Sequence, residues 1–241
     1  MQQHPPGNGA SHWLIYAAAA ALIVIGAKCW MIGHYGNPTP FWDQWDDEGA
    51  LLFPKYFGGT LKLSDLLSTH NEHRLFFTRI WLLLLLALEG YWDPIVQMLA
   101  NTLIVGALVV LLVGAVRPLL PSASWIVFVL FAILVFALPW TWGNTLDGFN
   151  CQYYFLLLFS IAGIVAIVGA QAFTPRWWIA ALLMLCSYFS LAGGATAAAA
   201  AFSICVVQMA VGSRRGVKES LALAVLAAAT VAMVLAVPVL P

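Results

Sequence analysis

Apolar runs near the length needed to cross a lipid bilayer recur along almost the whole chain. A transmembrane helix needs about 20 predominantly apolar residues. Runs close to that length cover residues 13–33, 75–92, 94–116, 124–142, 152–172, 177–193, 195–212 and 219–240. Because the bilayer interior offers the backbone no water, such runs favour helices over an open sheet. The sequence therefore predicts an all-α, polytopic membrane helix bundle with seven or eight transmembrane helices.

The composition supports the same class and excludes others. Charged residues make up only 8% of the chain and hydrophobic residues 63%, whereas soluble domains are about a quarter charged. The formal net charge is zero, so no basic surface for nucleic acid is expected. The four cysteines form no C-x-x-C pair, and we interpret them as small apolar residues rather than metal ligands. We expect a multi-pass integral membrane protein.

One connection differs from all the others in length and polarity. We divide the chain into an N-terminal tail (1–12), a first transmembrane helix (13–33), a long amphipathic loop (34–74) and a membrane helix bundle (75–241). Six of the ten acidic residues and three of the five histidines fall in the loop. Long loops in compact proteins are often functional, so the loop is the expected place of a site.

The orientation of this loop depends on one doubtful span. Basic residues lie in three later connections, at Arg117, at Arg176 and in the stretch 214–218. The positive-inside rule places these connections in the cytoplasm. If all eight runs cross the membrane, the loop lies on that side too. The run 75–92 contains Arg79 and Glu89, and if it does not cross, the loop lies on the opposite side.

The loop carries an acidic stretch and a basic stretch. In "FWDQWDDEG" the spacing of Asp43, Asp46 and Asp47 places them on one face if the stretch is helical. The later "SDLL" is typical of a helix start, with Ser64 or Asp65 as N-cap. If that helix continues through "HNEHR", it aligns a second set, His70, His73 and Arg74. One face could then deprotonate a hydroxyl while the other holds a phosphate.

The residues "WDQWDDEG…HNEHR…TR", followed by "WDP" at Trp92 and "NTLDGFNCQYYFLLLFS" from Asn144, resemble the GT-C class. These are polytopic glycosyltransferases that use polyprenyl-phosphate sugars. The resemblance covers most of the chain and implies that the loop faces outward. It also implies that a loop aspartate is the general base for the acceptor and that cationic side chains hold the departing lipid phosphate.

Carried over to this chain, the resemblance implies Asp43 as the base, with Asp46 as the second choice, because the interval from Asp43 to Gly58 mirrors that of the class. It implies a phosphate-binding set of His70, His73, Arg74, Arg79 and Lys55. A wider candidate pocket consists of Asp47, Glu48, Glu72, Asn144, Asp147, Asn150 and Gln152. For the last four, a plain turn between helices is the alternative interpretation.

Metal binding stays open at the acidic stretch. Carboxylate oxygens suit a hard divalent cation such as Mg²⁺ or Mn²⁺, and a site without metal or a merely solvated loop are the alternatives. His70, Glu72 and His73 make a poor zinc set because they supply only two imidazoles and one carboxylate on another face. We assign no metal ligand from the sequence.

The sequence thus favours a membrane glycosyltransferase, or its N-terminal module, in the bacterial cytoplasmic (inner) membrane. Its expected partners are a lipid-linked sugar donor, membrane lipid and further membrane subunits. The alternative is a non-catalytic integral membrane subunit or scaffold of a larger complex. A proton- or ion-coupled transporter is disfavoured, because the spans after residue 93 are almost free of ionisable residues.

Overall fold

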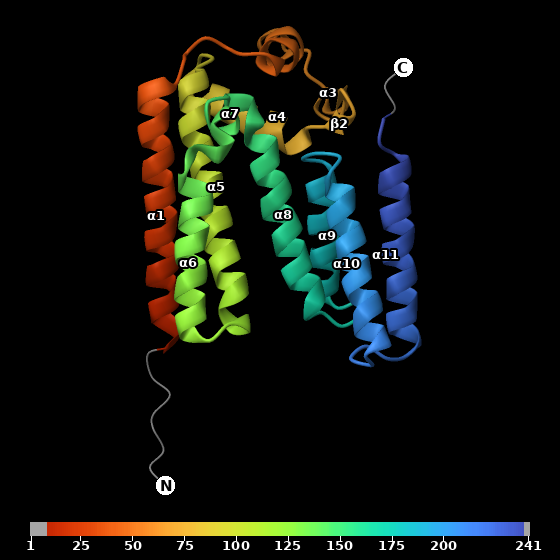
Figure 1. Ribbon diagram of the computed structural model, residues 1–241. Coiled ribbons are helices and arrows are strands. Elements are labelled where there is room, and N and C mark those ends of the chain that lie inside the picture. Colours follow the sequence, from red (N-terminus) through yellow and green to blue (C-terminus); the bar gives the residue numbers. More distant parts are fainter. Residues whose placement is uncertain (1–8, 239–241) are drawn as a thin grey trace.

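The computed structural model describes residues 9–238 and is a helical bundle (Figure 1). Helices account for 78% of the structure, which confirms the all-α class. Seven helices run along a common direction: α1 Gly9–Tyr35, α5 Pro94–Val116, α6 Ser122–Ala137, α8 Cys151–Val168, α9 Pro175–Tyr188, α10 Gly194–Ala210 and α11 Val217–Leu235. Of the predicted tail 1–12, residues 1–8 lie outside the described residues, and the remainder already belongs to α1.

Several of these helices have the length and hydropathy of membrane spans. Within residues 9–238, five segments qualify: Trp13–Tyr35, Pro94–Leu119, Ser122–Thr145, Gly148–Val168 and Val217–Leu235. Helix α10 is apolar but shorter, at 17 residues, and α9 has 14 residues. The chain is therefore a helical membrane protein, while the count of seven or eight crossings stays a prediction.

The doubtful run 75–92 forms α4, Phe76–Glu89, a helix of 14 residues. At 1.5 Å per residue it is about 21 Å long, shorter than the bilayer core of about 30 Å. It ends at Gly90, whose φ of 80° lies in the left-handed region that glycine adopts readily. Helix α4 lies near the end of the bundle that also carries the long loop (Figure 1).

The two ends of the bundle differ in charge. The connections α5–α6, α8–α9 and α10–α11 lie together at one end, with Arg117 and Arg214 in them and Arg176 in the first turn of α9; we call this the basic end. The long loop, α4 and the connection between α6 and α8 lie at the opposite end, the loop end (Figure 1). Because α4 does not cross the bundle, the long loop and the basic connections lie at opposite ends.

The long loop has secondary structure of its own. It contains the π-helix η1 Gln44–Leu52, the helices α2 Phe53–Phe57 and α3 Leu63–Leu66, and a hairpin of β1 Thr69–His70 and β2 His73–Arg74. The predicted helix through "HNEHR" is wrong, because α3 ends at Leu66 and the chain reverses at Asn71. The φ of Asn71 is 50°, a left-handed value that asparagine tolerates. The N-cap of α3 is Lys62 rather than Ser64 or Asp65.

Three apolar clusters hold the bundle together. One cluster joins α1, α5, α6 and α8. Within it, Gly106 lets α5 pack closely against α1, because a Cβ at this position would lie 2.6 Å from Ile25 Cδ1. A second joins α8, α9, α10 and α11 around Trp177. The third packs Leu52, Leu75 and Phe149 beneath the loop. The loop thus rests on its own apolar base at the loop end.

Candidate functional site

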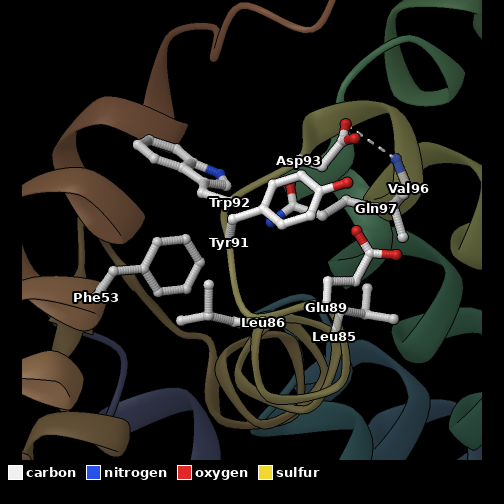
Figure 2. A pocket seen from close by; sticks show the side chains of 9 residues that line it. All are labelled: Phe53, Leu85, Leu86, Glu89, Tyr91, Trp92, Asp93, Val96 and Gln97. Atoms are coloured by element: carbon white, nitrogen blue, oxygen red, sulfur yellow. Dashed lines mark hydrogen bonds between the residues drawn. The ribbon is translucent and has the colours of Figure 1, made fainter.

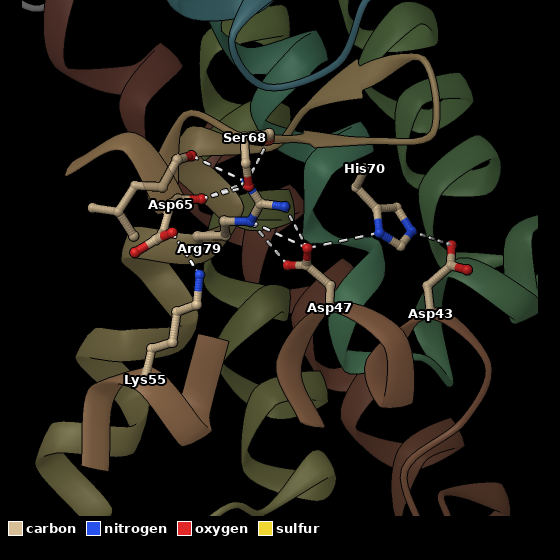
Figure 3. A network of polar contacts seen from close by, with 8 residues as sticks. Asp43, Asp47, Lys55, Asp65, Ser68, His70 and Arg79 are labelled. Atoms are coloured by element: carbon tan, nitrogen blue, oxygen red, sulfur yellow. Dashed lines mark hydrogen bonds and ion pairs between the residues drawn. The ribbon is translucent and has the colours of Figure 1, made fainter. Parts of the chain in front are cut away.

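Asp43, His70 and Asp47 form the centre of the polar cluster at the loop end (Figure 3). The Nε2 atom of His70 lies 3.6 Å from Asp43 Oδ2, and its Nδ1 atom lies 3.7 Å from Asp47 Oδ1. The side chain of Asp43 is 40% exposed, whereas that of Asp47 is 1% exposed. The imidazole thus lies between two carboxylates, and of these two only Asp43 has an exposed side chain.

Asp43 is the N-cap of the π-helix η1, and Asp47 lies within that helix. Hydrogen bonds from residue i to i+5 widen the turn of η1, and the structure brings the pair Asp43 and Asp47, four residues apart, to the same histidine. Asp46, three residues from Asp43, is exposed, and neither ion pair of His70 involves it. The predicted common face of Asp43, Asp46 and Asp47 is therefore wrong for Asp46, because that spacing assumed an α-helical turn.

Arg79 holds the loop to α4. Its side chain is completely buried and makes a bidentate contact with the Asp47 carboxylate. Its Nη1 atom also donates to three main-chain carbonyls in α3 and the turn that follows it, those of Asp65, Leu66 and Ser68. These protein acceptors satisfy the guanidinium, so its place in the structure is that of a positioning residue rather than a phosphate ligand.

Lys55 is similarly engaged. Its Nζ atom lies 2.6 Å from Asp65 Oδ1, and Asp65 Oδ2 accepts the main-chain N–H of Lys62 at 2.8 Å. The hydrogen bond from Lys55 and that from the Lys62 backbone hold the pKa of the Asp65 carboxyl below its ordinary value. The ion pair closes α2 onto α3 at the surface, where such pairs stabilise only weakly.

Glu48 is the most deeply buried acid of the cluster. Gln44 Nε2 donates to its Oε1 atom at 3.1 Å, and Gln97 Nε2 donates to its Oε2 atom. Burial raises the pKa of Glu48 to about 8, and the negative charges of Asp147 and Asp47 add to the rise, although the two amide hydrogen bonds oppose it. At neutral pH this carboxyl therefore holds its proton.

The second polar stretch, residues 144–152, also lies at the loop end. Asp147 accepts hydrogen bonds from Phe149 N at 3.0 Å and from Asn150 Nδ2 at 3.1 Å. Burial raises the pKa of Asp147 to about 6, and the charge of Asp43 adds to the rise. The turn contacts the long loop, since a Cβ on Gly148 would lie 3.3 Å from Gln44 Nε2, whereas Glu72 of the wider candidate pocket lies beside His73 and is half-exposed.

The remaining members of the turn serve its packing. Asn144 contributes its main-chain carbonyl to Tyr154 Oη. Gln152 is buried, and its Nε2 atom lies 3.4 Å from Asn150 Oδ1. Gly148 lies against Gln97, since a Cβ on it would be 2.5 Å from Gln97 Oε1. The close approach explains why the turn carries a glycine at this position.

The hairpin separates the predicted phosphate-binding set. His70 and His73 are directly paired across the strands and therefore share one face, while Arg74 pairs with Thr69 on the other. Arg74 Nη1 donates to Tyr188 Oη at 3.0 Å and to the Ala236 carbonyl at 2.8 Å. His73 lies 3.8 Å from the half-exposed Glu72. The structure thus does not place Arg74 beside His70.

Two glutamines and one lysine at the loop end were not predicted as site residues from the sequence. Gln44 and Gln97 bind each other at 2.7 Å as well as Glu48. Lys28, 3% exposed within α1, donates to Thr145 Oγ1 at 2.9 Å. Polar residues inside apolar helices are the available signal for such positions. Asn101, within α5, accepts from Trp81 Nε1 at 3.0 Å and donates to the Gly148 carbonyl at 2.8 Å.

A small cavity adjoins the cluster between the loop, α4 and α5 (Figure 2). It holds about 10 Å³, roughly the room that one water needs. Its lining combines aromatic and acidic side chains from these segments: Phe53, Leu85, Leu86, Glu89, Tyr91, Trp92, Asp93, Val96 and Gln97. Asp93 caps α5 by accepting the Ile95 N–H at 2.8 Å. The cavity is too small for a lipid headgroup without movement of the loop.

Two acids of the stretch are already bound within the protein. Among residues 9–238, no three His, Cys, Asp or Glu side chains converge as metal ligands. Both oxygens of Asp47 are bound by Arg79, and Glu48 is bound by two amides. A divalent cation at the acidic stretch stays a prediction, which the contacts of Asp47 and Glu48 do not test.

No protein-family model, curated protein or solved structure matches the chain.

Proposed function

We propose that the chain is a membrane glycosyltransferase, or a module of one, that transfers a sugar from a polyprenyl-phosphate donor to an acceptor hydroxyl or amine. The observation that carries the proposal is the setting of Asp43. It is the accessible carboxylate of the Asp43–His70–Asp47 group, with its Oδ2 atom 3.6 Å from His70 Nε2. A general base needs an accessible oxygen that can accept the proton of the nucleophile.

In the proposed reaction, the acceptor oxygen or nitrogen attacks the anomeric carbon while Asp43 removes its proton. The bond between that carbon and the phosphate oxygen breaks, and its electron pair leaves on the polyprenyl phosphate. Positive groups beside this oxygen stabilise the transition state. We assign this role to His73, which shares one face of the hairpin with His70 beside Asp43, whereas Arg74 lies on the other face.

The charge distribution supports an outward-facing site. The positive-inside rule assigns the basic end to the cytoplasm, which leaves the loop end on the opposite side. Seven crossings, by α1, α5, α6 and α8 to α11, give this arrangement, with α4 lying at the surface. We propose that the protein works in this orientation in the bacterial cytoplasmic membrane, where the donor lipid reaches the loop end from the outer leaflet.

Transfer is tested with purified protein in liposomes that contain polyprenyl-phosphate mannose or glucose and bacterial membrane lipids as acceptors. The measurement is the release of polyprenyl phosphate by mass spectrometry. Asp43→Asn should lower the release at least about 100-fold, the usual effect of losing a general base. Asp46→Asn removes the same charge three residues away; loss of transfer there, with retention in Asp43→Asn, would contradict the assignment.

A second candidate function, a non-catalytic membrane subunit, is favoured by the internal pairing of the cluster. Arg79 with Asp47, and Lys55 with Asp65, are paired within the chain, and the adjoining cavity holds about 10 Å³. A scaffold needs only such an internally paired cluster and no cavity for a substrate. Wild-type protein that consumes neither donor, and that co-purifies with a stoichiometric membrane partner, would support this function instead.

A further inference from the structure

A groove opens at the basic end, between the α8–α9 and α10–α11 connections. Its volume is about 470 Å³, within the range of small-molecule sites, roughly 300–1,000 Å³. Its lining is polar and includes three cations: Gln171, Ala172, Thr174, Ser213, Arg214, Arg215, Lys218 and Glu219. An adjoining hollow of about 220 Å³ shares Gln171, Ser213, Arg214 and Glu219 with it. The groove lies at the opposite end of the bundle from the Asp43 cluster.

A buried ion pair forms the inner wall of this groove. Arg214, 8% exposed, donates to Glu219 Oε2 at 2.9 Å and to Gln208 Oε1 at 2.6 Å. Glu219 Oε1 in turn accepts the main-chain N–H of Ala172 at 2.8 Å. These contacts join the two connections and fix the shape of the groove, while the charges of the pair cancel.

Two further cations remain for an occupant. Arg215 and Lys218 are exposed, and neither side chain takes part in a hydrogen bond or ion pair within residues 9–238. Arg215 lies over Gly212, where a Cβ would come within 2.4 Å of Arg215 Nη2. The φ of Gly212 is 74°, so both the backbone and the guanidinium favour glycine there. The groove therefore carries about two uncompensated positive charges.

The position of the groove is that of lipid headgroups. Lys218 lies in the first turn of α11, whose apolar span of 19 residues is only 17% buried inside the protein. Trp178, at the start of α9, is 54% exposed, and tryptophan is typical of the membrane–water interface. An occupant with a phosphate in the groove could thus lay acyl chains along α11.

We propose that this groove binds the phosphate of an anionic phospholipid in the leaflet at the basic end. Arg215 and Lys218 contact the phosphate, and the Arg214–Glu219 pair holds the connections that carry them. Zwitterionic lipids bring a cationic group that the two cations repel, so the groove discriminates against them. This site is independent of the glycosyl transfer proposed for the loop end.

The test is titration calorimetry of the intact protein in a neutral detergent with short-chain phosphatidylglycerol, short-chain phosphatidylcholine and inorganic phosphate. Phosphatidylglycerol should bind and phosphatidylcholine should not. Each cation near an anionic headgroup strengthens binding about fivefold, so the double variant Arg215→Gln/Lys218→Gln should weaken binding about 30-fold and Lys218→Gln alone about fivefold.

Arg117→Gln is the matched control, because it removes the same charge at the basic end but outside the groove, where Arg117 lies 5.3 Å from the Trp125 ring centroid. It should bind phosphatidylglycerol like the wild type. Unchanged binding in Lys218→Gln and in the double variant, or an equal loss in the control, would overturn the site. Inorganic phosphate that binds as tightly as phosphatidylglycerol would overturn the lipid as its occupant.

Discussion

Replacing Arg79 by methionine should release the long loop from the bundle. The substitution leaves the Asp47 carboxylate, 1% exposed, without its bidentate partner, and it removes the donor to three carbonyls in α3 and the turn that follows it. Breaking a buried pair by removing one partner costs about 3–5 kcal/mol. The cost falls on the contact between η1 and α4, so we expect local opening of the loop to become easier by that amount.

Hydrogen exchange measured by mass spectrometry reports this opening directly. A decrease of about 3–5 kcal/mol in the free energy of local opening accelerates hydrogen exchange of the η1 amides about 160- to 5,000-fold. Lys55→Met removes the exposed pair with Asp65 and should change exchange less than about fivefold, since surface pairs contribute about 1 kcal/mol or less. Exchange in η1 that is no faster in Arg79→Met than in Lys55→Met would refute the reasoning.

Three further outcomes are expected. The pKa of Glu48 is about 8 in the folded protein and 4.5 in the unfolded chain. The free energy of unfolding should therefore fall by up to about 5 kcal/mol as the pH rises from 4.5 to about 8. Thermal unfolding of Glu48→Gln should show a flatter dependence on pH. Gly148→Ala should lower stability by about 1–3 kcal/mol through overpacking, whereas Gly26→Ala, which meets nothing within 4 Å, should not. In a cysteine-free background, Trp42→Cys and Lys218→Cys should react with an impermeant maleimide from opposite sides of the membrane; labelling of both from one side would contradict the opposite ends.

The sequence was sufficient for the elements that depend on local composition. The predicted first helix, 13–33, lies within α1, and the polarity concentrated in the long loop lies at one end of the bundle. Apolar length and loop polarity decide these features without reference to the rest of the fold. The membrane class followed from the same local pattern.

Features that depend on turns and distant contacts were predicted less well. Nothing near "DQWDDEG" specifies a π-helix, because its widened turn is stabilised by Arg79 and Gln97, 32 and 49 residues away from their partners Asp47 and Glu48. The hairpin at "HNEHR" had one local signal, the tolerance of Asn71 for a left-handed φ. The helical spacing of the histidines favoured a continuous helix instead. Arg74 was consequently predicted to share a face with His70 and His73, which is wrong.

The residues that contact Asp47 and Glu48 lie far along the sequence from them. These separations also set an order of assembly during synthesis. Chains are made at about 5–20 residues per second, N-terminal part first. Asp47 is therefore made some 2–6 seconds before Arg79, 32 residues later, and Glu48 some 2–10 seconds before Gln97, 49 residues later. During that interval both acids must stay hydrated. The apolar base beneath the loop also includes Phe149 and Leu191, which are made later still, so the loop can close fully only after the helices on both sides of these residues have been made.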